Sequence, residues 1–396
     1  MSKETGKNIV PKLRFPEFRD KDYWGIDSLG VAIKSESSSL AQNKLQLLDN
    51  GYPVYGADGL IGYTESFEQD EDYIAIIKDG SGVGRLFLYK KESSILGTLS
   101  YLKSQDSKTY ELKFLFYLLQ TINLTSYIKG SGIPHIYYSD YSKALTAIPK
   151  PPEQQKIADC LSSLDDFITA ENKKLEALKA HKKGLMQQLF PVEGEIVPKL
   201  RFAEFKDAEE WVEKILSEVA NYENGKAHEQ DIVEEGEYIV VNSKFISSDG
   251  KVRKYTNTPF CLAEKDDILM VLSDVPNGKA IAKCFFVDTN NLFSVNQRIC
   301  KITAFDVNGL LLFYILNRNS YFLAFDDGVK QTNLRNDDVL NFPMLLPKDP
   351  KEQQRIAECL SSLDTLITAQ TEKIEVLKIH KKGLMQQLFP IITDQK

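Results

Sequence analysis

The chain has 396 residues, of which 42% are hydrophobic and 27% charged, and its formal net charge is −7. This length predicts two to three domains with an ordinary soluble composition. The acidic balance excludes a generic polycation that coats nucleic acid, but it allows a DNA reader whose basic residues gather on one face. The polar N-terminus lacks a signal-peptide core, and the longest apolar run, Leu310–Leu316, is too short to cross a bilayer. We therefore expect a cytoplasmic protein without a membrane partner.

The first predicted segment, residues 1–20, contains the sequence PKLRFPEFRD at Pro11–Asp20. A closely similar sequence, PKLRFAEFKD, occupies Pro198–Asp207 within a second segment at residues 192–207. The spacing between the two copies is 187 residues. An internal repeat of this kind indicates two halves of one architecture, each opened by a short anchor segment.

A variable domain follows each anchor segment, at residues 21–150 and 208–349. Alternating apolar residues and Gly or Asp turns predict strands in YPVYGADGLIGYTE and in YIVVNSKFISSDGKVRKYT. Tyr73–Lys78 and Ile268–Leu272 are predicted as buried strands, and the sequences ELKFLFYLLQTI and GLLLFYILNR as one helix per domain. The Gly-rich DGSGVGR is interpreted as a hairpin turn, since a phosphate-binding loop would need a following Lys-Ser/Thr.

A long helix is predicted after each domain, at residues 151–191 and 350–390, before a tail at 391–396. Each helix opens on proline and has an acidic first turn, and 29 of 39 aligned positions are identical at a spacing of 199 residues. Apolar residues at alternating steps of four and three form a coiled-coil seam in each helix. The predicted seam residues are Ile157, Leu161, Leu164, Ile168, Leu175, Leu178, Ile356, Leu360, Leu363, Ile367, Ile374 and Leu377.

The predicted fold is α+β, with two pseudo-symmetric mixed α/β domains separated by two long antiparallel coiled-coil helices. About 38 residues at 1.5 Å each would make every rod roughly 57 Å long. The alternative is a coiled coil between chains, but this chain already carries two matching helices. A pseudo-twofold relation also predicts that Pro11–Phe18 docks near the end of the second long helix, which would bring the two ends of the chain together.

No catalytic constellation is evident in the sequence. There is no GxxxxGK[ST] loop and no HExxH motif, and the five cysteines include no CxxC pair. Cys160 and Cys359 are repeat equivalents and are expected to be core thiols. His181 and His380 are also equivalents, expected to pack on the helix rather than bind metal.

The order of these segments resembles the specificity subunit of type I restriction–modification systems. The resemblance covers nearly the whole chain, and it is carried by PKLRFPEF, by PPEQQKIADCLSSLDDFI and by HKKGLMQQLFP, each with its counterpart in the second half. It implies that the variable domains are target recognition domains, each reading one half of a bipartite, asymmetric DNA site, with the helices setting the gap. It also implies that this chain is a recognition subunit and not an enzyme.

The same resemblance implies partners and cofactors. The partners would be double-stranded DNA, two modification subunits that methylate adenine and two restriction subunits that cleave DNA. S-adenosylmethionine, ATP and Mg would bind those subunits, with none on this chain. A protein-interaction scaffold without DNA is the alternative function. A third possibility, a methyltransferase or nuclease on this chain, is poorly supported because no [ND]PP[YFW] motif occurs.

Candidate DNA contacts come from polar loops that mix Lys or Arg with hydroxyls and amides, because Arg reads guanine, Asn and Gln read adenine, and Lys meets phosphate. Neither variable domain is basic overall, with 13 Lys/Arg against 15 Asp/Glu in residues 21–150 and 15 against 21 in residues 208–348. The loops KGSGIPHIYYSD and GVKQTNLRNDD hold matching positions shortly before the long helices. The candidates are Lys78, Ser81, Arg85, Lys129, Ser131, His135, Tyr137, Tyr138, Lys244, Lys251, Arg253, Lys254, Asn277, Lys279, Asn296, Gln297, Arg298, Lys330, Gln331, Thr332, Asn333 and Arg335.

Overall fold

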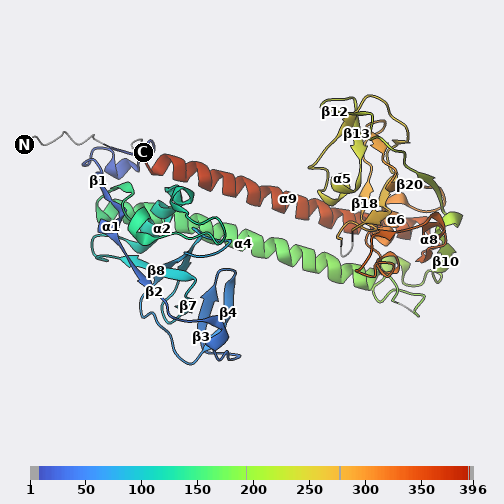
Figure 1. Ribbon diagram of the computed structural model, residues 1–396. Coiled ribbons are helices and arrows are strands. Elements are labelled where there is room, and N and C mark those ends of the chain that lie inside the picture. The colour runs from blue at the N-terminus through green and yellow to red at the C-terminus, as the bar shows by residue number, and fades with distance from the viewer. Residues whose placement is uncertain (1–8, 193, 276–277, 391, 393–396) are drawn as a thin grey trace, which may run out of the picture. The chain divides into compact units, whose positions relative to one another are not determined.

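The computed structural model describes residues 9–192, 194–275, 278–390 and 392. The chain divides into two compact units, one formed by Met1–Lys174 with Gln370–Lys396 and the other by Leu175–Ala369. Each unit contains one α+β domain together with parts of α4 (Pro151–Leu189) and α9 (Pro350–Leu388), the two long helices (Figure 1). The predicted fold class is confirmed.

An antiparallel sheet in the order β2-β8-β5-β6 forms the centre of the first unit. Its strand β5 (Tyr73–Ile77) is buried on both faces: Ile74 and Ile76 join the core that contains helix α2, whereas Tyr73 and Ile77 join a second core. This double burial explains the continuous apolar run in the sequence. The domain's remaining elements are β1 (Gly25–Ser28), α1 (Leu29–Ala32), β2 (Ile33–Ser37), β3 (Tyr52–Gly56), β4 (Gly59–Thr64), β6 (Leu86–Tyr89), β7 (Ser94–Ile95), β8 (Leu99–Ser104), α2 (Leu112–Thr121), α3 (Tyr138–Tyr141) and β9 (Leu145–Ile148).

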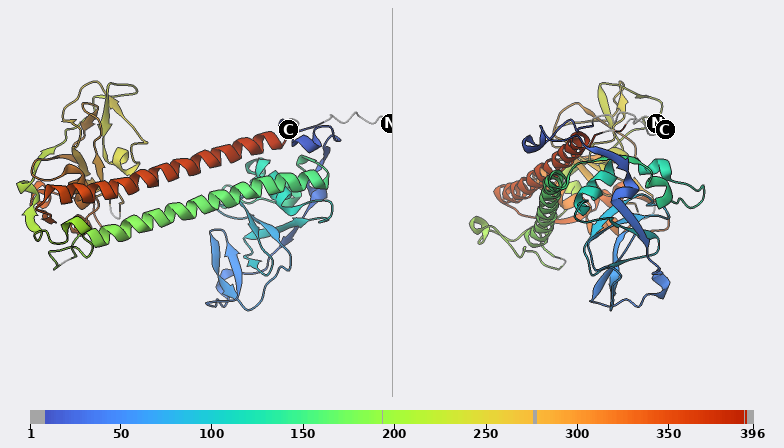
Figure 2. Two further views of the ribbon diagram at one scale, coloured as in Figure 1. Left: turned by 180° about the vertical axis from the view of Figure 1, so that it is seen from behind. Right: turned by 90° about the vertical axis from the view of Figure 1, so that its left-hand side faces the viewer.

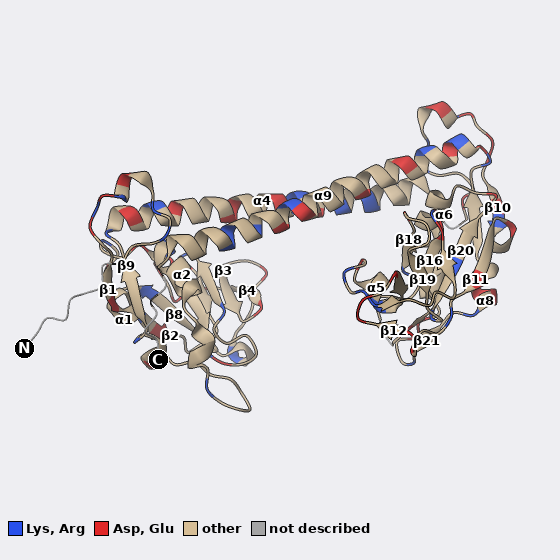
Figure 3. Ribbon diagram, turned by 90° about the horizontal axis from the view of Figure 1, so that it is seen from above, with Lys and Arg blue, Asp and Glu red and all other residues tan. Residues whose placement is uncertain are grey.

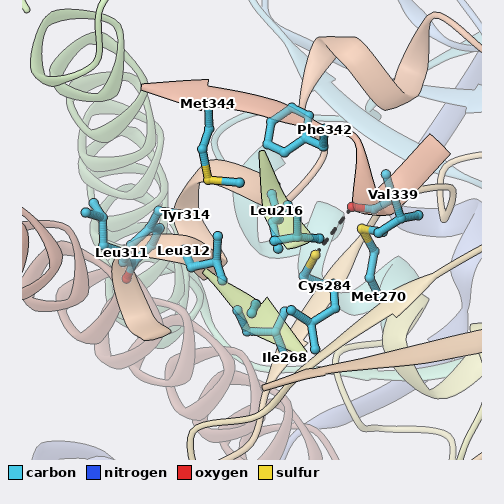
Figure 4. Packing of buried hydrophobic residues seen from close by; sticks show 14 of the residues in the cluster. Leu216, Ile268, Met270, Cys284, Leu311, Leu312, Tyr314, Val339, Phe342 and Met344 are labelled. Carbon is cyan, nitrogen blue, oxygen red and sulfur yellow. Dashed lines mark hydrogen bonds between the residues drawn. The ribbon is translucent and has the colours of Figure 1, made fainter. Parts of the chain in front are cut away.

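The second unit repeats this plan with an antiparallel sheet in the order β11-β20-β16-β18. Figure 4 shows its core, where Ile268 and Met270 of the sheet lie with Leu312 of helix α6, and the Leu216 amide donates to the Phe342 carbonyl at 3.0 Å. The elements are β10 (Val212–Ile215), β11 (Ala220–Asn224), β12 (Ile232–Val233), β13 (Tyr238–Val241), α5 (Ser243–Ser247), β14 (Tyr255–Thr256), β15 (Leu262–Ala263), β16 (Ile268–Val271), β17 (Ser273–Asp274), β18 (Cys284–Phe286), β19 (Phe293–Val295), β20 (Ile299–Ala304), α6 (Gly309–Leu316), α7 (Ser320–Leu323), β21 (Thr332–Asn333), α8 (Asn336–Leu340) and β22 (Pro343–Leu346).

One predicted strand is wrong. Within YIVVNSKFISSDGKVRKYT, the segment Ser243–Ser247 is helix α5 between strands β13 and β14. The Asn242 side chain accepts a hydrogen bond from the Phe245 amide at 2.9 Å and caps the helix. Phe245 and Ile246 are buried in the core. A good cap and two buried side chains outweigh the strand preference of the β-branched and aromatic residues.

The long helices pack against each other in opposite directions within each unit (Figure 2). In the first unit, Glu171 of α4 contacts Gln370 of α9, and Asp165, nearer the start of α4, contacts Lys381, nearer the end of α9. In the second unit, the pairing of Lys182 with Asp364 follows the same antiparallel order. All twelve predicted seam residues are buried or partly buried. The chain therefore supplies the partner of each helix itself.

The anchor segment docks on the start of the long helix through one arginine. In the first unit, Arg14 donates from Nε and Nη2 to the two carboxylate oxygens of Glu153, at 2.8 and 2.7 Å. The same guanidinium also donates to the backbone carbonyls of Lys21 and Asp22. The Arg14 and Glu153 side chains are 8% and 4% exposed. The hydrogen bond to Glu153 raises the pKa of Arg14, so the guanidinium stays charged.

The second unit builds the same joint from the repeat equivalents. Arg201 donates to both oxygens of Glu352 at 2.7 Å and to the carbonyls of Ala208 and Glu209. In addition, the Trp211 indole lies 3.4 Å from Glu352 Oε1. The recurrence of PKLRF and of the helix-opening glutamate thus reflects one ion-paired joint that is used twice.

The anchor segment Pro11–Phe18 docks beside the end of α9 in the first unit, as predicted. The Leu13 amide donates to the Gln387 carbonyl at 3.0 Å, close to the end of α9. In the second unit, the Leu200 amide makes the equivalent bond to Gln188 at 2.9 Å. Leu388 and Phe389 also enter the core of the first domain. The end of each long helix is therefore part of a domain core as well as part of the helix pair.

A second shared joint ties each domain to both helices. In the first unit, Asp165 accepts from the Tyr117 hydroxyl at 2.7 Å and from Lys381 Nζ at 2.5 Å. In the second unit, Tyr314 and Lys182 bind the two oxygens of Asp364. Burial, and then the hydrogen bond to Asp165, raises the pKa of Tyr117 well above its ordinary value, which keeps the hydroxyl a donor.

The free energy of unfolding should depend on pH through Glu171. Hydrogen bonds from Gln370, and then from Lys373, lower the pKa of Glu171. The stabilisation from this group is therefore complete above its unfolded pKa of about 4.3 and is lost as pH falls through the lower, folded value. We expect Gln370→Leu to lower the unfolding free energy at pH 7 and the loss to shrink below about pH 4. Denaturant-induced unfolding of the wild type and the variant, measured across this pH range, tests the prediction.

The matched control for this prediction is Gln354→Leu, which removes an exposed glutamine from the same helix. This variant should follow the wild-type pH profile. A Gln370→Leu deficit that is the same at pH 3 and pH 7 would contradict the role assigned to Glu171.

Candidate nucleic-acid interface

Two of the predicted loops meet at one end of the central sheet in the first domain. The Ile136 amide donates to the Lys78 carbonyl at 2.9 Å, and the Gly80 amide donates to Pro134 at 2.9 Å. His135 Nδ1 lies 2.7 Å from Asp79 Oδ1. The loop after β5 and the loop before β9 thus form one composite surface, which we call the first loop junction (residues 78–85 and 129–138).

Most candidate side chains at the first loop junction face solvent. Ser81, Arg85, Lys129, Ser131 and Tyr137 are exposed, whereas Lys78 and His135 are partly buried. Two of the exposed cations have neighbours that hold them in place.

Lys129 Nζ lies 2.7 Å from Asp140, and Arg85 donates to the Ala57 carbonyl at 3.1 Å. Beside Ala57 lies an open hollow of about 720 Å³, formed by Leu40–Gln42, Gly56–Ile61 and Leu96–Thr98. The guanidinium of Arg85 therefore borders a concave surface.

Tyr138 serves the scaffold of the junction. Its hydroxyl donates to the Ile33 carbonyl at 2.6 Å, and its ring lies edge-on to Tyr141. Burial raises the pKa of Tyr138. Its neighbour Tyr137 is exposed, and the Tyr137 ring stacks on His135 with centroids 6.4 Å apart. Of the two tyrosines, only Tyr137 presents an exposed ring, the kind of surface on which a base could stack.

The second domain brings the equivalent loops together. The Leu334 amide donates to the Leu272 carbonyl at 2.8 Å, the counterpart of the bond between Ile136 and Lys78. Strand β17 pairs with β21, so Ser273 lies opposite Asn333. We call this surface the second loop junction (residues 272–281, without 276–277, and 326–335). The loops KGSGIPHIYYSD and GVKQTNLRNDD therefore occupy equivalent places in the two domains, as their positions in the sequence predict.

The candidates at the second loop junction differ from those of the first. Gln331 Nε2 donates to Ser273 Oγ at 2.7 Å, and Thr332, which is buried, donates to Asp326 at 3.0 Å. Arg298 lies next to the junction: it is exposed, and its backbone carbonyl accepts from the Leu272 amide at 2.9 Å. The remaining candidates at this junction are also exposed, namely Lys279, Lys330, Asn333 and Arg335.

Several candidates lie away from the second loop junction. Lys244 is exposed on α5. Lys251, Arg253 and Lys254 are exposed in the segment that leads into β14, which belongs to the separate sheet β12-β14-β13-β19-β15. The remaining candidates of this half are Asn296, which is partly buried, Gln297, whose side chain donates to Glu229, and Asn277, which lies outside the described residues.

The carboxylates near these loops bind backbone amides, so an acidic domain can still present exposed cations in its candidate interface. Asp274 accepts from the Ala280 amide at 2.6 Å, and Asp327 accepts from the Lys330 and Val329 amides at 3.0 and 2.9 Å. Those backbone bonds lower the pKa of Asp327. Along α4 and α9, acidic and basic residues are interspersed (Figure 3). The net charge of a domain is therefore a poor guide to the charge of its loop junction.

Sequence reasoning missed the joint residues. Arg14 and Tyr117 bind carboxylates of α4, yet neither was singled out. The available signal was that each residue and its carboxylate partner both recur in the second half. Among the described residues, no group of three or more His, Cys, Asp and Glu could hold a metal ion. No helix in the described ranges is long and apolar enough to span a membrane.

The chain contains two domains of the same fold. Each has a loop junction rich in hydroxyls, amides and cations, as expected of a protein that recognises a ligand at two places. Residues 31–180 and 208–378 match the family described as type I restriction modification DNA specificity domain. The match extends over more than half of the chain, which therefore belongs to this family. Its role is DNA sequence specificity, as a recognition subunit that works with other subunits.

Curated relatives agree with this assignment, and a solved structure shares the fold. The specificity subunit of type I restriction enzyme MjaVIII from Methanocaldococcus jannaschii is 28% identical over 343 residues, which is 81% of this chain and 79% of that protein. The EcoDI specificity subunit from Escherichia coli is 25% identical over 182 residues, 45% of this chain and 40% of that protein. A crystal structure of a type I S subunit from M. genitalium matches the fold with a TM-score of 0.68 at 18% identity, covering 97% of this chain and all of that one.

Proposed function

We propose that this chain reads a bipartite, asymmetric DNA site, with each loop junction contacting the bases of one half-site. The observation that carries the proposal is that the two junctions share one backbone arrangement but differ in side chains. His135 and Tyr137 characterise the first junction, whereas Gln331, Asn333 and Arg335 characterise the second. One scaffold with two sets of side chains is what two different half-sequences require. A scaffold without DNA is not favoured by membership of a DNA specificity family.

The enzymatic partners complete the proposed function. Two modification subunits bind the chain and methylate adenine with S-adenosylmethionine, and two restriction subunits use ATP and Mg to cleave DNA. No cofactor is assigned to this chain. The 29 identities in 39 aligned positions of the two long helices support two copies of one partner, because similar surfaces bind similar ligands. The family assignment supports assembly with further subunits.

The proposal predicts weak DNA binding by the chain alone. Both domains carry net negative charge, so phosphate contacts contribute little without a partner. Purified chain should bind its site with a Kd in the micromolar range or weaker at physiological salt, and addition of the modification subunit should tighten binding by at least about 100-fold. Fluorescence anisotropy measures both values. Nanomolar, site-specific binding by the chain alone would count against the proposal.

The lengths of α4 and α9 are proposed to set the unread gap between the half-sites. Four residues inserted after Thr169, and four after its repeat counterpart Thr368, should lengthen both helices by ~6 Å, or about two base pairs. Four residues come close to one helical turn and keep the seam nearly in phase. Because Glu171 and Gln370 bind each other, both helices must be extended together.

Sequencing of methylated sites in cells that carry this variant measures the gap. The gap should grow by about two base pairs while both half-sites stay unchanged. The same four residues inserted between Asp70 and Glu71, both exposed in a loop of the first domain, provide the control and should leave the gap as it is. An unchanged gap in the helix variant would reject the role of a ruler.

A further inference from the structure

The structure contains the same groove twice, once in each unit. In the first unit, an open groove of about 630 Å³ lies between the last turns of α9 and the domain, where Leu118 and Thr146 form the opposite wall. In the second unit, a groove of about 1460 Å³ lies between the last turns of α4 and the domain, with Ile315 and Met344 at the corresponding places.

The helix wall of both grooves is built from identical residues. Seven positions line each groove from the long helix and its end, and all seven carry the same residue in both copies. They are Lys179, Lys182, Lys183, Met186, Gln187, Phe190 and Pro191 in one copy and Lys378, Lys381, Lys382, Met385, Gln386, Phe389 and Pro390 in the other. Six of the seven belong to the sequence HKKGLMQQLFP, which is unchanged between the halves.

Only part of this identity is explained by the fold. Lys182 and Lys381 are held by Asp364 and Asp165 in the joints to the domains. Lys183 and Lys382, by contrast, are exposed and make no ion pair within the described residues. A solvated lysine tolerates substitution, so its retention in both copies beside a groove calls for a ligand.

The lining indicates the chemistry of the ligand. Each groove is lined by its lysines and by a partly buried methionine, Met186 in one copy and Met385 in the other. Methionine beside an aromatic ring is a surface type enriched at protein–protein interfaces. The first groove is lined by three lysines and no carboxylate. In the second groove, Asp364 forms an ion pair with Lys182. Arg318, Glu195 and Glu213 also line this groove. A groove that is lined by both lysines and apolar side chains is complementary to a segment in which carboxylates flank an apolar side chain.

We propose that each groove binds the same segment, acidic with an apolar anchor, from one of two copies of a partner protein. The inference rests on the proposed function, because it takes the modification subunit as that partner. The unchanged helix wall recognises the common segment, while the opposite wall varies with the domain. DNA is the less suitable occupant, since phosphates gain nothing from a floor of Met and Phe.

Charge reversal in the full-length chain tests the proposal. Lys382→Glu should weaken binding of one modification subunit on the order of tenfold and Lys183→Glu that of the other, and the double variant should lose both. Sedimentation or native mass spectrometry with purified modification subunit counts the bound copies, and calorimetry gives each affinity. Met385→Ser removes an apolar side chain from the groove without changing its charge. It should weaken binding of the same modification subunit as Lys382→Glu does.

The controls are Lys173→Glu and Lys351→Glu, two exposed lysines of α4 and α9 that do not line a groove. Both variants should bind two subunits with wild-type affinity, and thermal melts should show every variant folded. Equal binding by wild type and by the groove variants would overturn the groove assignment alone. No binding of the subunit by wild type would overturn the proposed function. Loss of DNA binding with intact subunit assembly would make the grooves phosphate sites and overturn the proposal.

Discussion

Arg14→Ala is expected to lower the free energy of unfolding by about 3–5 kcal/mol, which is the usual cost of removing one partner of a buried ion pair. The cost arises because Glu153 would remain only 4% exposed with no cation to balance it. The carbonyls of Lys21 and Asp22 would lose their donor as well. Arg14→Lys should also be destabilised by a large part of this amount, because an ammonium cannot make the paired bonds of a planar guanidinium.

Arg19→Ala is the matched control, since Arg19 lies in the same segment and is exposed. Its effect should stay within about 0.5 kcal/mol. Arg201→Ala removes the equivalent arginine from the second unit and should cost a similar amount. Denaturant unfolding, followed by tryptophan fluorescence from Trp24 and Trp211, measures all of these variants. An Arg14→Ala chain as stable as the Arg19→Ala chain would contradict the buried joint.

Exchange of residues 21–150 for the corresponding domain of another family member is expected to change one half of the methylated sequence and to leave the other half intact. The physical reason is that Arg14 and Gln154, at the start of α4, bind main-chain atoms of the domain. Arg14 contacts two backbone carbonyls, and Gln154 contacts the amide of Glu111 and the carbonyls of Thr109 and Pro149. A different sequence with the same backbone can make every one of these bonds.

Sequencing of methylated sites in cells that carry the exchanged chain and its modification partner reads the outcome. Exchange of residues 208–349 is the matched experiment, and it should alter only the opposite half-site. Gln353 there binds the Asn308 amide and the Pro347 carbonyl, so the joint of the second domain also relies on main-chain groups. If one exchange changed both half-sites, or neither, the assignment of one half-site to each domain would fail.

The parts of the fold that were predictable are those with a repeat or a period. The seam of α4 and α9 follows from a pattern of four and three, and the docking of Leu13 beside Gln387 follows from the equivalence of the halves. The partners of Arg14 and Tyr117 were out of reach because they lie 139 and 48 residues away. Contacts of this range leave no local pattern.

The candidate interface was predictable as residue types in loops but not as a surface. The sequence places Lys78 and His135 in separate loops, and they come together only in the fold, through contacts such as the pairing of Ile136 with Lys78. Burial also separates residues that look alike in sequence, since Tyr137 is exposed whereas Tyr138 is bonded to the scaffold. Loop conformation, set by carboxylates such as Asp274, decides which polar side chain is exposed at the junction.

The contact between Glu171 and Gln370 has a consequence for the origin of the chain. These residues are repeat counterparts, 199 positions apart, so the position faces its own copy. In a dimer of two half-length chains the same position would hold two identical side chains, and two glutamates would repel. When both halves belong to one polypeptide, the position can hold an acceptor, Glu171, in one helix and a donor, Gln370, in the other. The single chain thereby gains an asymmetric joint as well as two different domains, and two copies of the first half alone would make a poor substitute.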